Sequence, residues 1–226
     1  MAYEFILVDT HDAVGLVTLN RPAALNALCA GLIVELGQAL DAVEASDARC
    51  LLITGAGRAF CSGANLNDPD KPPIDRHAEA EGKQKSDLET WYNPTFQRLR
   101  ALSIPTVASI NGVAAGAGMS LALSADIKLM AKSAFFLQAF ARIGLVPDCG
   151  STWILPRLIG IARAVELSLL AERLPAEKAG AWGLVNEVVP DEDLQAASRA
   201  MAERLAAGPS SLGLIRRMYW DALDND

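Results

Sequence analysis

The 226-residue sequence is poor in the residues that build metal sites, disulfide frameworks and basic surfaces. It has two histidines, and its four cysteines show no C-x-x-C spacing, which leaves little for a zinc site and favours reduced thiols in a cytoplasmic protein. A net charge of −7 argues against nucleic-acid binding, because nucleic-acid-binding proteins carry a basic face. No apolar run has the length of a membrane span, and the N-terminus lacks the basic start of a signal peptide. We therefore expect neither a metal, nor a nucleic-acid partner, nor a membrane.

The remaining composition is that of a soluble globular protein, with 51% apolar and 21% charged residues. Strand and helix patterns alternate along the chain, which predicts an α/β fold. The region 67–85, rich in Pro, Asp, Glu and Lys, predicts a mobile surface loop. Strands are expected at 3–8, 13–19, 50–54, 106–110, 125–131 and 184–189. Helices are expected at 28–43, 88–102, 162–170, 176–181 and 194–207, and from about 152 and 212 onward.

The most informative stretch is Pro105–Leu123. Its run Thr106–Ile110 predicts a buried strand, Asn111 and Gly112 break that strand, and mainly small residues follow as far as Gly118. The helix expected next would begin with almost no side-chain bulk, so that a ligand oxygen could approach its unpaired N–H groups. Close packing of the helix on a sheet explains the small residues equally well. The glycine spacing fits neither a dinucleotide fingerprint nor a phosphate loop.

A second segment of interest is Pro147–Gly150. Asp148 stands just before an expected helix, and aspartate is a favoured helix N-cap. Placed between Pro147, Cys149 and Trp153, its carboxyl group could instead have a pKa above the aspartate reference of about 3.9. A raised pKa would suit a general base. The residues alone leave both interpretations open.

Six motifs follow one another along nearly the whole chain. They are Asn20–Pro22, Ala24–Ala27, Leu52–Gly55 with Gly63–Leu66, Ser109–Gly118, Ile143–Pro147 and Ala181–Val189. Together they resemble the crotonase (enoyl-CoA hydratase/isomerase) superfamily. The resemblance implies a crotonase-like spiral of ββα turns over residues 1–190, usually assembled as a homotrimer or homohexamer. Residues 191–226 would be the start of a C-terminal helical region that is longer in other family members.

The resemblance also implies that the substrate is an acyl-CoA thioester, with coenzyme A entering as part of the substrate and no separate cofactor. The backbone N–H groups of Ala64 and Ala117 would hold the thioester oxygen. The family commonly has glycine at the second position, but alanine keeps the N–H and needs only a negative φ. The residues implied to contact the substrate and its CoA portion are Ala24, Leu25, Ala27, Ser62, Gly63, Asn65, Leu66, Gly116 and Pro147.

The expected chemistry is proton transfer beside a thioester. Removing that proton puts negative charge on the carbonyl oxygen, which two fixed N–H donors stabilise. Hydratases of the family have glutamates at the positions of Ser120 and Phe140, and both are absent here. The chain is most similar to the phenylacetate-pathway branch, whose enzymes isomerise ring-epoxide phenylacetyl-CoA to oxepin-CoA and shift double bonds in enoyl-CoAs. The proposed base of that branch matches Asp148.

We therefore expect an isomerase acting through Asp148. The alternatives are an enoyl-CoA hydratase and a non-catalytic scaffold that binds acyl-CoA. Ser120 is either a hydroxyl donor or a packing residue. Cys61 and Cys149 are interpreted as unreactive thiols, since no histidine lies near either in the sequence. Three further residues, each of which could line the site or belong to the scaffold, are Trp91, Tyr92 and Glu89.

Overall fold

The computed structural model describes residues 3–68, 81 and 85–223, so most of the surface loop expected at 67–85 lies outside the described residues. The strands are β1 (Ile6–His11), β2 (Val14–Leu19), β3 (Cys50–Gly55), β4 (Ala59–Cys61), β5 (Thr106–Ile110), β6 (Val113–Ala115), β7 (Ile127–Ala131), β8 (Phe135–Leu137), β9 (Arg173–Pro175) and β10 (Glu187–Val189). The α-helices are α1 (Ala30–Glu44), α3 (Asn93–Ala101), α4 (Ala117–Leu123), α5 (Ser151–Ile159), α6 (Ile161–Leu170), α7 (Ala176–Ala181), α8 (Leu194–Ala206) and α9 (Ser211–Ala222). Short 3₁₀ segments span Pro22–Ala24, Ala139–Ile143 and Asp191–Asp193, and a π-helical turn spans Leu88–Tyr92.

The strands form two sheets, and most consecutive strands alternate between them. The six-stranded sheet has the order β1-β2-β3-β5-β7-β10, with β1 antiparallel to β2 and the other neighbours parallel. The four-stranded sheet has the order β4-β6-β8-β9, with β9 antiparallel to β8. The pairs β3–β4, β5–β6 and β7–β8 each place one strand in the larger sheet and the next in the smaller one. This arrangement confirms the expected α/β spiral of ββα turns.

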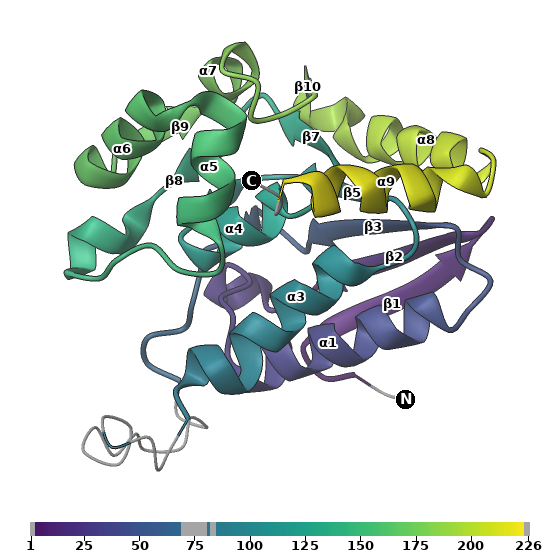
Figure 1. Ribbon diagram of the computed structural model, residues 1–226, viewed down its shortest axis with the longest axis horizontal. Helices are drawn as coiled ribbons and strands as arrows, with labels where there is room; N and C mark the ends of the chain where they lie inside the picture. The colour runs from purple at the N-terminus through teal and green to yellow at the C-terminus, as the bar shows by residue number, and fades with distance from the viewer. Residues whose placement is uncertain (1–2, 69–80, 82–84, 224–226) are drawn as a thin grey trace.

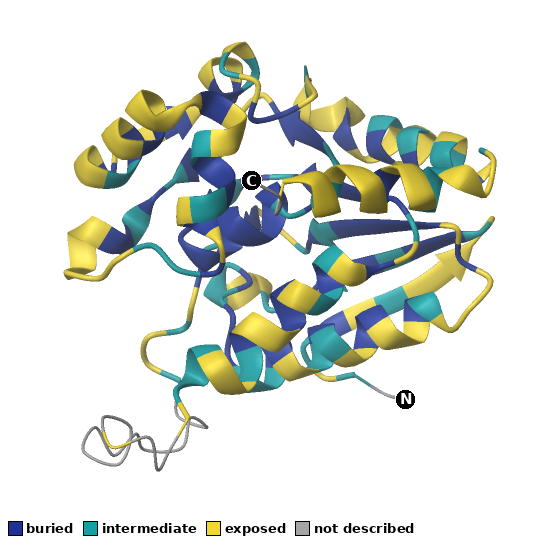
Figure 2. Ribbon diagram, viewed as in Figure 1, coloured by how far each residue is buried: buried dark blue, intermediate teal, exposed yellow. Residues whose placement is uncertain are grey.

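Helices cover both faces of the larger sheet (Figure 1). Helix α1 packs on β1 and β2 and against α3, whereas α8 lies across β3, β5 and β7 on the other side. The strands between them are largely buried, and α4 is buried at all seven of its residues, as the dark blue interior of Figure 2 shows. A run such as Cys50–Ile53, buried at every residue, is typical of a parallel strand covered on both faces. Strands β3 and β5 therefore lie in the interior of the molecule.

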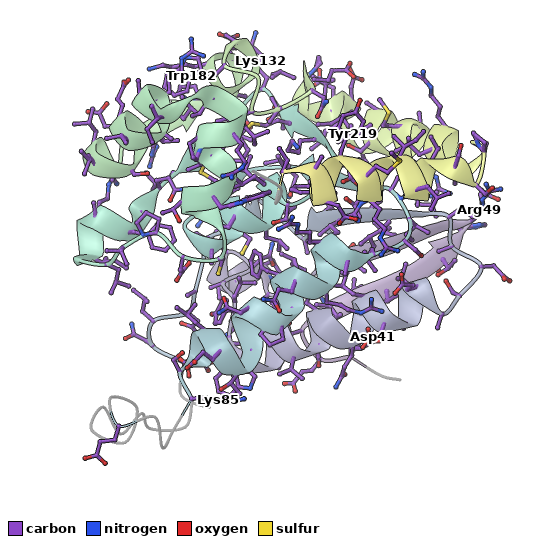
Figure 3. All side chains as sticks on the ribbon, viewed as in Figure 1. Asp41, Arg49, Lys85, Lys132, Trp182 and Tyr219 are labelled. Carbon is purple, nitrogen blue, oxygen red and sulfur yellow. The ribbon has the colours of Figure 1, made fainter. Side chains whose placement is uncertain are left out.

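Side chains at the periphery attach the outer helices. Arg49, labelled in Figure 3, donates from Nη2 to Gly208 O at 2.6 Å and ties the link between α8 and α9 to the chain just before β3. None of the helices in the described part of the chain combines the length and the apolar character that a membrane span requires. Across residues 3–68, 81 and 85–223, no group of three or more His, Cys, Asp or Glu side chains could hold a metal ion.

Several element boundaries differ from the sequence-based expectations. The first helix begins at Ala30, because Cys29 is its N-cap and its sulfur accepts a hydrogen bond from the helix. The single helix expected over 88–102 is divided into the π-helical turn and α3, with Pro94 in the first turn of α3, where a missing N–H costs nothing. The late strand begins only at Glu187. The first turn is made by Asp12 and Ala13, since His11 still belongs to β1.

The short strands of the smaller sheet had no strand pattern in the sequence. Strands β4, β6, β8 and β9 have three residues each, too few to show a period of two. Val113–Ala115, interpreted as part of a turn and helix start, is strand β6. The segment expected to form a strand, a turn and a helix therefore forms two strands, β5 and β6, followed by helix α4.

Candidate active site

The first candidate amide, that of Ala64, lies just beyond strand β4. Leu28 N donates to Gly63 O at 2.8 Å, and Asn65 N donates to Leu28 O at 2.8 Å. In this parallel bridge the N–H of Ala64 itself faces away from Leu28. Gly63 has φ = 100°, and a Cβ on it would lie 2.8 Å from Ala115 O. Only glycine therefore fits at the close approach that precedes Ala64.

The second candidate amide belongs to Ala117, the first residue of α4, which follows β6. Gly116 has φ = 50° and ψ = −126°, and its N–H donates to Leu137 O at 2.9 Å, which fixes the turn. Strands β4 and β6 are parallel neighbours, and neighbouring strands lie about 4.8 Å apart. Both amides thus leave the same edge of the smaller sheet. A Cβ on Gly63 would lie 3.7 Å from Ala117 N.

Both amides are available to a ligand. The N–H of a first helical residue has no acceptor within its helix, and neither Ala64 N nor Ala117 N donates to a protein acceptor in the described part of the chain. Two such donors at neighbouring strand ends can stabilise one oxygen atom on which negative charge develops. The structure therefore brings together the two amides that the sequence analysis paired.

Asp148 occupies a tight turn before α5. Cys149 and Gly150 have left-handed φ values of 49° and 79°. The N-cap of α5 is Gly150, and no side chain caps the helix, so the interpretation of Asp148 as a side-chain N-cap is wrong. Instead, the main-chain carbonyl of Asp148 accepts hydrogen bonds from the first residue of α5, from Ser151 N at 2.9 Å and from Ser151 Oγ at 2.8 Å.

The Asp148 carboxyl group is short of hydrogen-bond donors. Its residue is half-buried, and its Oδ1 is buried with no hydrogen-bond partner among the described residues. Burial raises its pKa above that of an ordinary aspartate, and a hydrogen bond with Cys149 offsets part of this effect. Because its negative charge is poorly stabilised, the ionised group is a stronger base than an exposed aspartate.

Tyr92 packs beside the Asp148 turn. Its hydroxyl donates to Leu28 O at 3.0 Å, in the segment that holds Ala64. Burial raises the pKa of Tyr92, and the neighbouring groups Cys149, Cys61 and Asp148 raise it further. These four ionisable groups therefore share one neighbourhood, in which Tyr92 is a buried part of the scaffold.

The other residues singled out from the sequence have structural roles. Burial raises the pKa of the Cys61 thiol to about 12 and raises that of Cys149 as well, in agreement with unreactive thiols. Glu89 is exposed, and its carboxylate accepts from Ser86 N at 2.9 Å and from Ser86 Oγ at 3.0 Å, so it is engaged within its own turn of the chain. Trp91 is partly buried against the hydrophobic core.

Phe140 and Ser120 stand at the two positions where glutamates are expected in a hydratase of the family. Phe140 is buried, and its Cζ would lie 3.7 Å from a Cβ on Gly116. Ser120 is fully buried, with its Oγ 2.7 Å from Ser151 Oγ. Neither side chain can accept a proton from carbon as a carboxylate does.

The two segments expected to contact CoA lie side by side. Ser62 N donates to Leu25 O at 3.0 Å, and Ser62 Oγ donates to Ala24 O at 3.4 Å. Other residues of the expected set differ in exposure: Ala27, Asn65 and Pro147 are half-buried, Gly116 is buried, and Ala64 and Leu66 are exposed. Pro147 lines a separate groove between α5 and α6, so the structure does not place it with the CoA segments.

Asn26, which the sequence analysis left without a role, holds the Ala24–Ala27 loop in place. It is fully buried, with φ = 55°. Its Oδ1 accepts from Arg21 N at 2.9 Å, and its Nδ2 donates to Ala56 O at 2.9 Å and to Ala59 O at 2.8 Å. The side chain thereby links the loop to the turn between β3 and β4.

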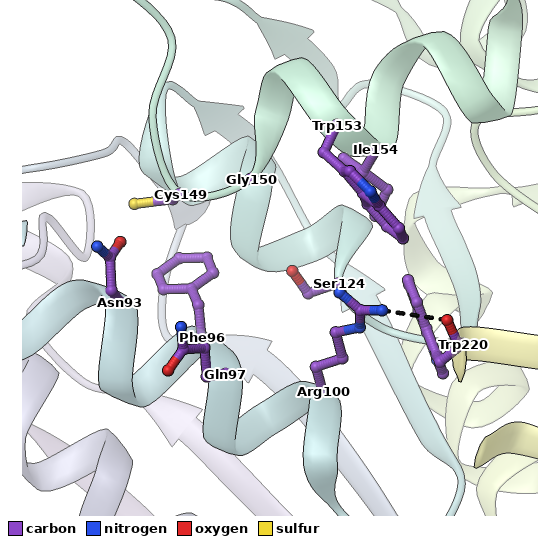
Figure 4. Close-up of a pocket in the computed structure, with 10 residues that line it drawn as sticks. All are labelled: Asn93, Phe96, Gln97, Arg100, Ser124, Cys149, Gly150, Trp153, Ile154 and Trp220. Atoms are coloured by element: carbon purple, nitrogen blue, oxygen red, sulfur yellow. Dashed lines mark hydrogen bonds between the residues drawn. The ribbon is translucent and has the colours of Figure 1, made fainter. Parts of the chain in front are cut away.

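A cavity of about 200 Å³ begins at the Asp148 turn (Figure 4). Cys149 and Gly150 form one end, and Figure 4 shows Trp153, Trp220 and Arg100 gathered at the other. The cavity is lined by Asn93, Phe96, Gln97, Arg100, Ser124, Cys149, Gly150, Trp153, Ile154 and Trp220. Its walls thus come mainly from α3, α5 and α9, and aromatic rings make up much of its lining.

Arg100 closes the far end of the cavity. Its guanidinium lies 4.5 Å from the ring centroid of Trp153 and 5.4 Å from that of Trp220, and the two indoles stack at 6.1 Å. Its Nη2 also donates to Trp220 O at 3.1 Å. No local sequence pattern indicates this group, because its residues lie far apart in the chain.

Comparison with known proteins identifies the family. The model of the enoyl-CoA hydratase/isomerase family matches residues 9–225. The chain is 45% identical to a 1,2-epoxyphenylacetyl-CoA isomerase of Escherichia coli (strain K12), over 98% of this chain and 84% of that protein. It is 42% identical to a probable enoyl-CoA hydratase of Rhodobacter capsulatus, over 100% of this chain and 84% of that protein.

Solved structures agree with the sequence comparison. An enoyl-CoA hydratase subunit I of Geobacillus kaustophilus HTA426 superposes with a TM-score of 0.88 and 32% identity, covering 99% of this chain and 84% of the other. A monofunctional enoyl-CoA isomerase of M. smegmatis superposes with a TM-score of 0.81 and 32% identity, covering 97% and 94%. The chain therefore belongs to the enoyl-CoA hydratase/isomerase family.

Proposed function

We propose that this protein is an enoyl-CoA isomerase that moves a proton between two carbons of an acyl-CoA thioester, with Asp148 as the base. The N–H groups of Ala64 and Ala117 bind the thioester oxygen. The observation that carries the proposal is the Asp148 carboxyl group, half-buried and with an Oδ1 that no described residue hydrogen-bonds. Coenzyme A enters and leaves as part of the substrate.

The reaction needs one proton acceptor and one oxyanion site. Ionised Asp148 takes a proton from the carbon next to the thioester or from its vinylogous position, and the electron pair moves toward the carbonyl oxygen. The two amides stabilise the resulting enolate. Asp148 then returns the proton to a different carbon, which shifts the double bond and regenerates the carboxylate. No water is consumed, so a second carboxylate is not required.

The acyl group proposed for this site carries a ring. The cavity that begins at Cys149 and Gly150 is of ring size and is lined by Phe96, Trp153 and Trp220, whose faces suit a planar group. A relative of 45% identity bears the name 1,2-epoxyphenylacetyl-CoA isomerase, which supports an acyl group derived from an aromatic ring. In such a substrate the same enolate chemistry accompanies opening of a ring epoxide.

Replacement of the base tests the mechanism most directly. Asp148→Asn keeps the size of the side chain and removes its ability to accept a proton. With a 3-enoyl-CoA as substrate, we expect the rate of 2-enoyl-CoA formation to fall about 10²–10⁴-fold. Asp47→Asn, at an exposed position, is the matched control and should retain full activity. Wild-type rates in Asp148→Asn would refute the role of Asp148.

The oxyanion site can be tested by deleting one N–H. Ala117 is the first residue of α4, a position at which proline is well tolerated. Ala117→Pro should lower kcat/KM about 10²–10³-fold, the usual loss for one oxyanion donor. The control is Ile161→Pro, at the exposed first position of α6, which should leave turnover unchanged.

Parallel assays separate the alternatives. Hydration of crotonyl-CoA at a higher kcat/KM than the 3-enoyl-CoA shift would identify a hydratase, the activity in the name of the Rhodobacter capsulatus relative. Binding of acyl-CoA with no turnover of a panel of ring-bearing and straight-chain thioesters would identify a non-catalytic binding protein.

A further inference from the structure

Ser120 lies in α4, one turn after Ala117, the first residue of that helix. It is fully buried, and a serine within a helix ordinarily bonds the carbonyl four residues earlier. Here that contact, from Ser120 Oγ to Gly116 O, is long at 3.4 Å, whereas Ser120 Oγ lies 2.7 Å from Ser151 Oγ. The main partner of this hydroxyl is therefore on a different helix.

The distances set the direction of the hydrogen bonds. A serine hydroxyl has one proton to donate. That of Ser151 is directed to Asp148 O at 2.8 Å, which leaves the Ser151 oxygen to accept from Ser120. Ser120 Oγ is also 3.5 Å from Asp148 O, too distant to compete with the 2.7 Å contact. The result is a directed chain from Ser120 to Ser151 to the main-chain carbonyl of Asp148.

The turn held by this chain contains a residue in an unfavourable backbone conformation. It follows an exposed segment, residues 143–146, and contains the left-handed Cys149, a conformation that a non-glycine residue adopts only when its surroundings require it. Ser151 N adds a second donor to the Asp148 carbonyl at 2.9 Å. Both hydroxyls are buried, so water does not compete for these bonds.

Anchoring through the carbonyl has a chemical advantage over anchoring through the carboxylate. A donor on the carboxylate would hold Asp148 in place but would also stabilise its charge and weaken it as a base. The structure fixes the residue by its main chain and leaves Oδ1 without a partner among the described residues. Position and basicity are thus set by different atoms.

We propose that Ser120 and Ser151 are positioning residues, a hydroxyl pair that fixes the carboxyl group of Asp148 relative to the amide of Ala117. The pair connects α4, which begins with that amide, to the turn that carries the base. The inference rests on the proposed function of Asp148. It is distinct from a packing role, which would affect stability alone.

The test uses Ser120→Ala and Ser151→Ala as separate variants. Ser168→Ala is the matched control, because Ser168 Oγ donates to Ala164 O at 2.8 Å within its own helix, α6, and not to the Asp148 carbonyl. Ser151→Thr keeps the hydroxyl and serves as the rescue variant. Circular dichroism and thermal melts verify that each variant is folded.

The first measurement does not depend on turnover. The Asp148 carboxyl group is titrated by ¹³C NMR, with its signal assigned by loss in Asp148→Asn. The ionisable groups that interact with it are Tyr92 from the π-helical turn and Cys149 in its own turn, and Cys61 of β4 lies beside these two. Both alanine variants should lower its pKa toward that of an ordinary aspartate as the turn relaxes and water enters. Ser151→Thr and Ser168→Ala should titrate like the wild type.

The second measurement is kinetic. A displaced base lowers the rate of proton transfer more than it lowers binding, so each alanine variant should lose about 10–100-fold in kcat with little change in KM. Folded alanine variants that titrate and turn over like the wild type would overturn the positioning role. The proposed function would be refuted by a different result, full activity in Asp148→Asn. The NMR comparison of the serine variants can be interpreted whatever that result is.

Discussion

Two aspartates in this protein have opposite surroundings. Asp126, just before β7, accepts hydrogen bonds from Thr106 N and Thr106 Oγ1 at 2.8 Å each, from Arg216 Nε at 2.6 Å and from Trp220 Nε1 at 2.8 Å. Asp148 has a buried Oδ1 with no partner in the described residues. One carboxylate accepts four hydrogen bonds and joins elements, while the other keeps one oxygen without a donor among the described residues. Under the proposed function, one residue type thus serves structure in one place and proton transfer in another.

The Asp126 region is a junction of three elements. Arg216 of α9 also donates to the carbonyls at the end of α3, to Leu99 O at 3.0 Å and to Arg100 O and Leu102 O at 2.7 Å each. Those carbonyls would otherwise lack partners at a helix end. The guanidinium thus joins α9 to α3 and to the strand region of Asp126, and keeps Trp220 at the end of the cavity.

The largest effect expected from this comparison concerns stability. Arg216→Ala should lower the free energy of unfolding by about 3–5 kcal/mol, since it leaves a largely buried carboxylate and several carbonyls without their donor. Urea denaturation measures the change. Arg217→Ala is the control: its exposed pair with Asp221, at 3.6 Å, should contribute about 0–1 kcal/mol. Equal losses in the two variants would contradict the role assigned to the junction.

An intermediate effect is expected for Trp220→Phe. This change keeps an aromatic ring against Arg100 and Trp153 but removes the Nε1 donor to Asp126. A hydrogen bond to a charged group typically contributes about 1.5–3 kcal/mol to stability, and we expect a loss in that range by urea denaturation. Tyr219→Phe, on the exposed neighbouring residue, should have no measurable effect. A Trp220→Phe variant as stable as the wild type would show that Trp220 Nε1 does not stabilise the junction.

The smallest effect, and one of opposite sign, is expected for Asp148→Asn. Because the folded-state pKa of Asp148 is raised, ionising this group costs more in the folded than in the unfolded protein. Wild type should therefore match the variant in acid, where both side chains are neutral, and become the less stable of the two as the pH rises through the folded-state pKa. Thermal melts from acid to neutral pH measure the difference. A variant less stable than wild type at neutral pH would show that the carboxylate is stabilised after all.

The activity of the wild type should follow the same ionisation. A base must be unprotonated to act, so kcat/KM should fall as the pH decreases through the pKa of Asp148, above the range of an ordinary aspartate. A pH–rate profile measures this midpoint. Activity that persists unchanged into the ordinary aspartate range would mean that the base is well solvated.

The sequence predicted those parts of the fold that have a local pattern. Strands β3 and β5 were found because buried parallel strands are apolar at consecutive residues. The three-residue strands of the smaller sheet were missed, since their identity depends on pairing with distant segments. The left-handed Cys149 and the buried Asn26 had no local signal either, because tertiary contacts impose both conformations.

The candidate site was predictable in its backbone and not in its side-chain partners. Ala64 and Ala117 were assigned through the resemblance to the crotonase superfamily, at two places where small residues follow strands. The interpretation of Asp148 as a helix cap could be excluded only from the structure, in which no side chain caps α5 and Asp148 uses its main-chain carbonyl instead. Arg100, Trp220 and the Ser120–Ser151 pair depend on contacts between residues far apart in the chain, which no motif encodes.

The pairing of β4 with β6 has a consequence for how this protein scaffold can change. The spacing between the Ala64 and Ala117 donors follows from the hydrogen-bonded ladder of two adjacent strands and requires no particular side chain. Under the proposed function, substitutions around the substrate carbonyl can therefore relocate or replace the proton-transferring group while the two amides still bind the thioester oxygen. Proteins with this scaffold could acquire new reactions by changing one turn at a time, while the two amides proposed to activate the substrate stay the same.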